Sequence, residues 1–236
     1  MALSLSVVIL CYRAGKDVKG FVEEVVDCLE KEMDDWQIIL VGNYFEGTGD
    51  RTPEVVREMA EMDDRIRAVT RIKEGMMGWD VRSGFAEATG DVIALIDGDG
   101  QMMGQDIVRA YRILRKEACD LVKTYRIKRH DGLYRGLISR VYNFIFHILF
   151  KGLDVRDVNS KPKLITKTAY GMLNLESDDW FIDAEIMIQA RRLRFKVIEI
   201  PSVFYELKGR RSFVRLPAIL EFIKNLIVAR IKEFLV

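Results

Sequence analysis

The chain has 236 residues, and its 37 lysines and arginines almost balance its 36 aspartates and glutamates, so that the formal net charge is +1. A charge this small gives no global reason to bind nucleic acid. Two histidines and three widely spaced cysteines indicate neither a histidine-based metal site nor a disulfide framework, and a reducing cytoplasm is expected.

Over the first hundred residues, short apolar runs alternate with segments of helical periodicity. The runs that predict strands lie at 5–10, 37–41, 66–69 and 92–96. Thr52-Pro53-Glu54 supplies the N-cap, the first-turn proline and the acid that begin a helix, and a glycine-punctuated helix is expected at 75–90. This alternation predicts an α/β fold with a doubly wound, mainly parallel sheet and helices on both faces.

After residue 100 the alternation gives way to longer helices. A helix at 106–116 and a strand at 120–125 precede a helix at 133–150 that is apolar around most of its circumference. Such a helix is buried in protein or rests against something other than water. The remaining predicted elements are a strand at 163–166, a helix at 182–193, a strand at 196–201 that ends at its proline, and an amphipathic C-terminal helix at 216–236.

An acidic turn, Asp97-Gly98-Asp99-Gly100-Gln101, directly follows the apolar strand at 92–96. The carboxyl edge of a parallel sheet is where open α/β folds bind ligands. Two carboxylates separated by one glycine can turn toward one point, which suits a hard divalent cation with a diphosphate completing its shell. The alternative is a polar turn that only closes a core strand, because such turns are rich in Asp and Gly.

A longer ordered pattern surrounds this turn, G-x-x-G-x-x-x-x-x-G-x-x-x-A-T-G-D-x-x-x-x-x-D-x-D-x-Q. It is carried by Gly75, Gly78, Gly84, Ala88, Thr89, Gly90, Asp91, Asp97, Asp99 and Gln101. With this pattern the chain resembles the family 2 glycosyltransferases, and among them the polyprenyl-phosphate sugar synthases typified by dolichol-phosphate mannose synthase. The resemblance covers nearly the whole chain. It implies a Rossmann-like GT-A fold and inverting transfer of a hexose, mannose or glucose, from a GDP- or UDP-linked sugar to dolichyl or polyprenyl phosphate.

The resemblance also implies a metal cofactor. Asp97, Asp99 and Gln101 are expected to hold Mg²⁺ or Mn²⁺ against the donor diphosphate, which makes the two aspartates catalytic. A metal ion there offsets the charge that builds on the leaving nucleoside diphosphate.

The nucleotide signature of the family is altered in this chain. Gly42 and Asn43 stand where relatives carry two acids that help to read the base, whereas Asp50 still matches. The loop at 208–212 resembles a basic loop that closes over the donor. The residues expected to bind the donor are Tyr12, Asn43, Asp50, Gly75, Gly78, Asp97, Gly98 and Arg211.

On the acceptor side, Arg126, Arg135 and Ser139 fall where the synthases hold the lipid phosphate. A guanidinium group presents a fork of donors that matches phosphate oxygens, although a solvated surface charge is the plain alternative. Asp183 and Glu185 match an acidic segment that supplies a catalytic base for sugar hydroxyls in many relatives. A phosphate acceptor is already an anion, so these two acids would then orient the substrate or cap the helix.

We expect one GT-A domain, with 1–125 as the nucleotide-sugar half and 126–236 as the acceptor half with interfacial helices. Because a polyprenyl chain is insoluble, the protein is expected at the inner face of the membrane, attached peripherally through the 142–150 region and the C-terminal helix. These segments equally fit the core or the interface of a homo-oligomer. Two alternatives stay open, namely transfer to a saccharide hydroxyl and a non-catalytic nucleotide-binding protein.

Overall fold

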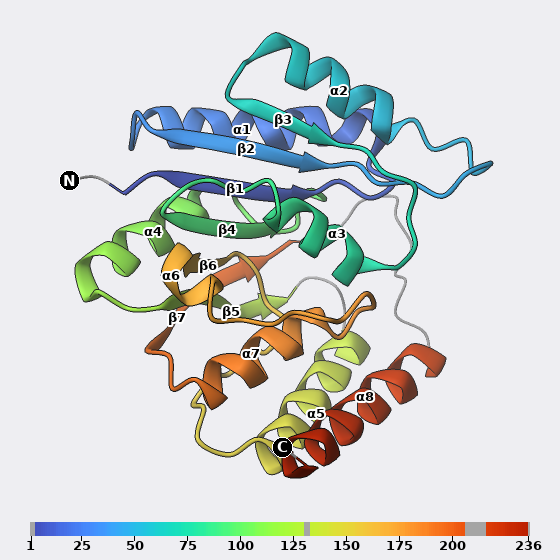
Figure 1. Cartoon of the computed structure of the whole chain (residues 1–236), viewed down its shortest axis with the longest axis vertical. Coiled ribbons are helices and arrows are strands. Elements are labelled where there is room, and N and C mark those ends of the chain that lie inside the picture. Colours follow the sequence, from blue (N-terminus) through green and yellow to red (C-terminus); the bar gives the residue numbers. More distant parts are fainter. Residues whose placement is uncertain (1–2, 130–132, 206–215, 236) are drawn as a thin grey trace.

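The computed structural model describes residues 3–129, 133–205 and 216–235 and is built on one seven-stranded sheet (Figure 1). The strand order is β3-β2-β1-β4-β6-β5-β7. The strands are β1 (Leu5–Leu10), β2 (Trp36–Val41), β3 (Ile66–Val69), β4 (Val92–Asp97), β5 (Leu121–Arg129), β6 (Lys163–Thr166) and β7 (Val197–Phe204).

The first four strands pair in parallel, as their alternation with helices predicts. Strand β5 pairs in parallel with β7 at the other end of the sheet. Between these two blocks lies β6, which runs antiparallel to both β4 and β5. The prediction of a mainly parallel α/β sheet is therefore confirmed, and the antiparallel strand in its middle is a feature that the sequence did not reveal.

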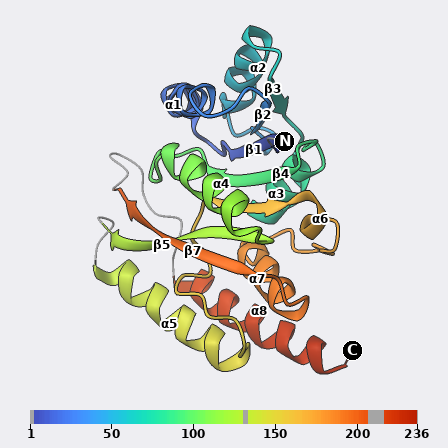
Figure 2. The same cartoon turned by 90° about the vertical axis from the view of Figure 1, so that its left-hand side faces the viewer.

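Helices cover both faces of this sheet (Figures 1 and 2). One core contains side chains of α1 (Val18–Glu30), α2 (Thr52–Met62) and α4 (Gln105–Glu117), and the other contains side chains of α3 (Met77–Phe85) and α7 (Ile182–Arg192). Successive residues of a strand point to opposite faces. Accordingly Val7 and Ile9 of β1 enter the first core, whereas Val8 and Leu10 enter the second. A short turn, η1 (Gly15–Asp17), follows β1, and α6 (Lys167–Tyr170) follows β6.

Helices α5 (Leu133–Leu149) and α8 (Leu216–Leu235) lie side by side beyond the β5–β7 end of the sheet (Figures 1 and 2). Their buried sides meet at Tyr142 and Phe222, whose rings pack edge-on with centroids 6.2 Å apart. The opposite sides expose large apolar residues, which are Leu137, Val141, Phe144, Ile148, Ile227, Val228 and Ile231. No helix in the described ranges has the length and apolarity needed to cross a bilayer.

Three predicted boundaries were wrong. Strand β5, predicted to end at residue 125, continues to Arg129. Strand β7 does not end at Pro201 but continues to Phe204, because β7 is the edge strand and a proline is tolerated where its missing N–H would face outward. Helix α3 ends at Phe85, well before Gly90. Gly90 packs instead on β1, where an added Cβ would lie 2.8 Å from the backbone nitrogen of Ser6.

Candidate active site

The acidic turn lies beside the end of β1 at the carboxyl edge of the sheet. The parallel register pairs Asp97 with Leu10, which brings the turn next to the loop that carries Tyr12. Gly98 is required between the two acids, because a Cβ there would lie 2.9 Å from Ile9 Cγ2 and 3.1 Å from the Leu10 carbonyl oxygen. Asp97 and Asp99 line one cavity of about 160 Å³. Its other lining residues are Leu10, Tyr12, Ala14, Lys73, Met76, Met77, Asp80, Gly98 and Trp180.

The two carboxylates fit a hard divalent cation. Mg²⁺ in particular is held by one or two protein carboxylates while substrate phosphates and water complete its shell. Gln101 is placed differently from the prediction, since its side-chain amide donates to the Tyr205 carbonyl at 2.9 Å and it does not line the cavity. In the part of the chain that the structure describes, no group of three or more His, Cys, Asp and Glu side chains gathers as a metal cage. The residues that would hold the ion are therefore Asp97 and Asp99.

Behind Asp97 lies a buried cluster of two lysines and one acid. Lys161 Nζ is 3.1 Å from Asp97 Oδ1 and 3.1 Å from Asp183 Oδ2, and Lys163 donates to Asp183 Oδ1. Burial alone would raise the pKa of Asp183, but the facing ammonium groups of Lys161 and Lys163 outweigh it and hold the pKa below its usual range. Burial lowers the pKa of Lys163 to about 8. Asp183 is thus a stabilised anion and a weak base.

A second buried pair, Lys73 and Asp80, forms another part of the cavity wall. Lys73 donates to Asp80 Oδ2 and to the Met76 carbonyl, and its ammonium lies 4.6 Å from the centroid of the Tyr12 ring. Burial lowers the pKa of Lys73 and raises the pKa of Asp80, because desolvation outweighs the attraction between them. Perturbed groups that line a cavity beside two further acids are typical of a functional site.

Asn43 is locked into this wall. Its Nδ2 donates to Asp80 Oδ1 and to Ser83 Oγ, both at 2.9 Å, and its Oδ1 accepts from the Arg71 backbone N–H at 2.8 Å. At the neighbouring Gly42, a Cβ would lie 2.7 Å from Val56 Cγ2. The two positions where the family carries acids therefore hold a buried structural amide and a glycine with no room for a side chain.

Gly75 and Gly78, two of the predicted donor-binding residues, allow the loop before α7 to pack closely against the start of α3. A Cβ at Gly75 would lie 2.8 Å from the Asp178 carbonyl oxygen, and one at Gly78 would overlap the backbone of Ser177. The N–H groups of Met76 and Gly78 donate to the carbonyls of Asp178 and Asp179 at 2.6 and 2.9 Å. These glycines bring two distant segments together at the rim of the cavity, close to Trp180.

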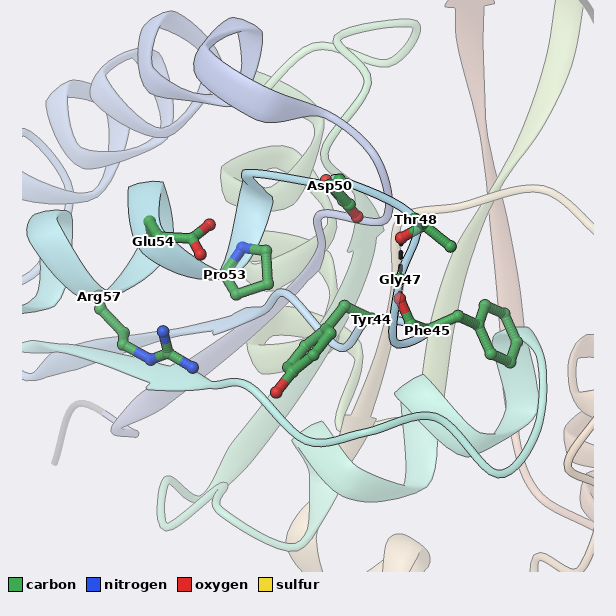
Figure 3. A pocket seen from close by; sticks show the side chains of 9 residues that line it. Tyr44, Phe45, Gly47, Thr48, Asp50, Pro53, Glu54 and Arg57 are labelled. Atoms are coloured by element: carbon green, nitrogen blue, oxygen red, sulfur yellow. Dashed lines mark hydrogen bonds between the residues drawn. The ribbon is translucent and has the colours of Figure 1, made fainter.

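Asp50 lies two residues before the start of α2 and borders a second hollow. Its Oδ1 accepts from the N–H and the hydroxyl of Thr52, whose Oγ1 in turn accepts from the Gly15 N–H at 2.9 Å. This chain ties the loops after β1 and β2 together. Figure 3 shows the hollow, of about 200 Å³, where Glu54 and Arg57 project from α2 and the preceding loop contributes the remaining walls. The loop residues that line it are Tyr44, Phe45, Gly47, Thr48, Gly49 and Asp50.

Of the predicted acceptor residues, Arg126 and Ser139 are described by the structure and are not among the residues that line the cavity. Arg126 forms a bidentate ion pair with Asp157 at 2.6 and 2.7 Å, and the Ser139 carbonyl accepts from Asn143. The side chain of Arg135 and the whole of Arg211 lie outside the described residues.

Glu185 also has a structural contact. Its two carboxylate oxygens accept the backbone N–H groups of Glu176 and Ser177 at 2.9 and 3.0 Å, which fixes the loop before α7. Sequence reasoning missed Lys73, Lys161 and Lys163. The signal available for the last two was a pair of lysines around Pro162 at the start of a strand whose other residues are apolar.

Comparisons with known proteins bear on this geometry. The family model described as "Glycosyl transferase family 2" matches residues 6–182. Glycosyltransferase AglD of Haloferax volcanii is 27% identical over 88% of this chain and 34% of its own length. Dolichyl-phosphate beta-glucosyltransferase ALG5D of Trichomonas vaginalis is 26% identical over 88% of this chain and 67% of its own length. The chain thus spans about a third of the first relative and two thirds of the second.

Among solved structures, glucosyl-3-phosphoglycerate synthase from Mycobacterium tuberculosis in complex with Mn²⁺, UDP and glucosyl-3-phosphoglycerate has a similar fold. The TM-score is 0.70 at 16% identity, and the match covers 97% of this chain and 80% of the other. At that identity the likeness concerns the fold alone, and it confirms the predicted GT-A architecture.

Proposed function

The chain belongs to glycosyl transferase family 2, and from this premise we propose that it transfers a hexose from a nucleotide sugar to a polyprenyl phosphate. The observation that carries the proposal is a cavity at the carboxyl edge of β1 and β4, which both acids of the turn line. Tyr12 offers an aromatic ring and Lys73 a buried ammonium on the same cavity, groups that suit a planar base and an anionic diphosphate.

In this proposal Asp97 and Asp99 hold Mg²⁺ or Mn²⁺. The ion would supply Lewis-acid stabilisation of the leaving nucleoside diphosphate. The other groups act without it: Asn43 and Asp80 keep Lys73 in place, and Gly98 keeps the turn close to β1. Because Asn43 is fully engaged in this wall, it acts on the donor through Asp80 and Lys73 rather than by reading the base.

The acceptor follows from the state of Asp183. A sugar hydroxyl needs a base to remove its proton, whereas a phosphate monoester is already an anion near neutral pH. Asp183 is ion-paired to two buried lysines and has a lowered pKa, so it is a poor base. This favours polyprenyl phosphate over a saccharide hydroxyl. The name of the Trichomonas relative supports glucose as the transferred hexose and dolichyl phosphate as a model acceptor.

The exposed apolar sides of α5 and α8 support attachment to a membrane surface. On α5 the residues Leu137, Val141, Phe144 and Ile148 repeat every three or four positions, and Phe144 is 66% exposed. Contiguous exposed apolar surface of this kind marks an interaction site. Flotation with anionic liposomes tests it. Phe144→Glu should reduce flotation, whereas the matched change at an exposed methionine of α2, Met62→Glu, should not; equal flotation of both variants would contradict this assignment.

The activity itself is tested by incubating the purified protein with Mn²⁺, a panel of UDP- and GDP-sugars and a short polyprenyl phosphate. Mass spectrometry should detect a hexosyl-phosphoryl lipid, with most product from a glucose donor, and Asp99→Asn should abolish it. Product formed only with saccharide acceptors would overturn the lipid acceptor. Nucleotide binding with no transfer to either acceptor class would favour the non-catalytic alternative.

A further inference from the structure

Lys161 joins the acidic turn to helix α7. Its ammonium is 3.1 Å from Asp97 Oδ1, 3.2 Å from Asp97 Oδ2 and 3.1 Å from Asp183 Oδ2, with Met77 Sδ at 3.4 Å. The Lys161 side chain is only 4% exposed, whereas that of Asp97 is 39% exposed and reaches the cavity. A buried fixed cation therefore touches both oxygens of an acid that faces the proposed donor.

The antiparallel strand β6 accounts for this position. Its register pairs Leu95 of β4 with Lys163. In an antiparallel pair, moving forward along one strand corresponds to moving back along its neighbour. Asp97, two residues after Leu95, therefore lies beside Lys161, two residues before Lys163. Lys163 lies on the same side and contacts Asp183 and the Ser160 carbonyl.

Lys161 contacts two carboxylates, Asp97 and Asp183, and Asp183 has a further lysine partner. Asp183 has two ammonium partners, Lys161 and Lys163, so its charge is neutralised even without Lys161. The cation of Lys161 is therefore available to Asp97 and to whatever binds beside it. An ammonium on both oxygens of a carboxylate competes with a metal ion for that carboxylate, and it also attracts a diphosphate placed in the cavity.

We propose that Lys161 is a positioning residue of the donor site, whose fixed charge supports nucleoside diphosphate binding without a metal ion and weakens metal binding without a nucleotide. This inference rests on the proposed use of a nucleotide sugar. With Lys161 in place, the divalent cation should bind well only together with the diphosphate. The diphosphate supplies metal ligands of its own and offsets the charge of Lys161.

The test compares the purified protein with Lys161→Met in three binding titrations. Mn²⁺ alone is titrated by electron paramagnetic resonance, and UDP is titrated by calorimetry in EDTA and in saturating Mn²⁺. Losing one charge-assisted contact changes an affinity by about tenfold or more. We expect Lys161→Met to bind Mn²⁺ alone about tenfold more tightly and UDP in EDTA about tenfold more weakly, so that UDP binding becomes more dependent on the metal.

Lys163→Met is the matched control, because it removes a neighbouring buried ammonium that contacts Asp183. It should tighten Mn²⁺ binding less than Lys161→Met does, because Lys161 still contacts both oxygens of Asp97. Lys161→Gln removes the charge but keeps hydrogen-bonding capacity, and it provides the same measurement if the methionine variant does not fold. In an Asp97→Asn background, loss of Lys161 should no longer tighten Mn²⁺ binding.

The inference is overturned if a folded Lys161 variant binds Mn²⁺ alone no more tightly than the parent, or if Lys163→Met tightens it equally. The Mn²⁺ titration contains no nucleotide, so its outcome is separate from that of the proposed function. Absence of UDP and GDP binding to the parent, even with Mn²⁺, would contradict the nucleotide-sugar donor and leave the Mn²⁺ result to decide the role of Lys161.

Discussion

Replacing Asp183 by Asn should destabilise the protein strongly while keeping the shape of the side chain. Asp183 is 3% exposed and faces Lys161 and Lys163. Lys161 keeps Asp97, but Lys163 would lose its carboxylate partner and face only neutral acceptors, the Ser160 carbonyl and the new amide oxygen. Removing one partner of a buried ion pair costs about 3 to 5 kcal/mol. Lys163, whose pKa burial already lowers to about 8, would then lose its proton more readily than in the parent.

The assay is urea denaturation followed by circular dichroism, with the free energy of unfolding extrapolated to water. A loss of about 3 to 5 kcal/mol moves the midpoint by roughly 1 M or more. The loss of stability should become smaller as the pH rises from 7 to 9. Without the Asp183 charge the pKa of Lys163 falls below its parent value of about 8, so the variant gains more stability over this range than the parent does. Glu185→Gln is the matched control, since its oxygens accept backbone N–H groups at a partly exposed site.

The reasoning would be refuted by a loss below about 1 kcal/mol, the level of a surface pair. Unchanged stability together with a large loss of transfer to saccharide hydroxyls would identify Asp183 as a base instead.

Three further outcomes are expected. Asp99→Asn should weaken Mn²⁺-supported UDP binding at least about tenfold with an unchanged melting temperature, because the Asn oxygen can still accept the Gln101 N–H; calorimetry and thermal melts measure this. Asn43→Asp should lower the free energy of unfolding by about 1 to 3 kcal/mol at pH 7, with partial recovery at pH 5, because it places a carboxylate beside Asp80, whose pKa burial already raises; an equal loss at both pH values would contradict it. The lowered pKa of Asp183 means that its stabilisation is present above about pH 4 and is lost as the pH falls through the lower folded value; acid titration of the parent should show this loss, and Asp183→Asn should lack it.

Some features of the molecule follow from local sequence. Largely apolar runs of four to six residues became β1, β2, β3 and β4, and the central strands β1 and β4 are buried on both faces, where side chains are mostly apolar. The acidic turn lies where predicted, at the carboxyl end of β4. These outcomes depend on residues near one another in the chain.

Other features of the site depend on contacts between residues far apart in the chain, and the sequence alone did not predict these contacts. The sequence marks Asn43 as a departure from an acidic signature and predicts that it binds the donor, whereas the fold makes it a buried link between Arg71 and Asp80. The sequence predicts Gly75 and Gly78 as donor-binding residues, and the structure shows them packed against the loop at 177–179. The absence of side chains at these glycines permits this close packing. Their part in donor binding therefore stays a prediction.

The sequence by itself determined the doubly wound sheet, the family and the two acids at the cavity, because periodicity and short motifs record which residues must be buried or turned together. Only the tertiary structure decided what surrounds those acids. Lys161 lies 64 positions from Asp97 in the chain and reaches it because β6 inserts antiparallel beside β4. Strand insertion and register are set by packing across the whole sheet, and no local pattern in the sequence encodes them.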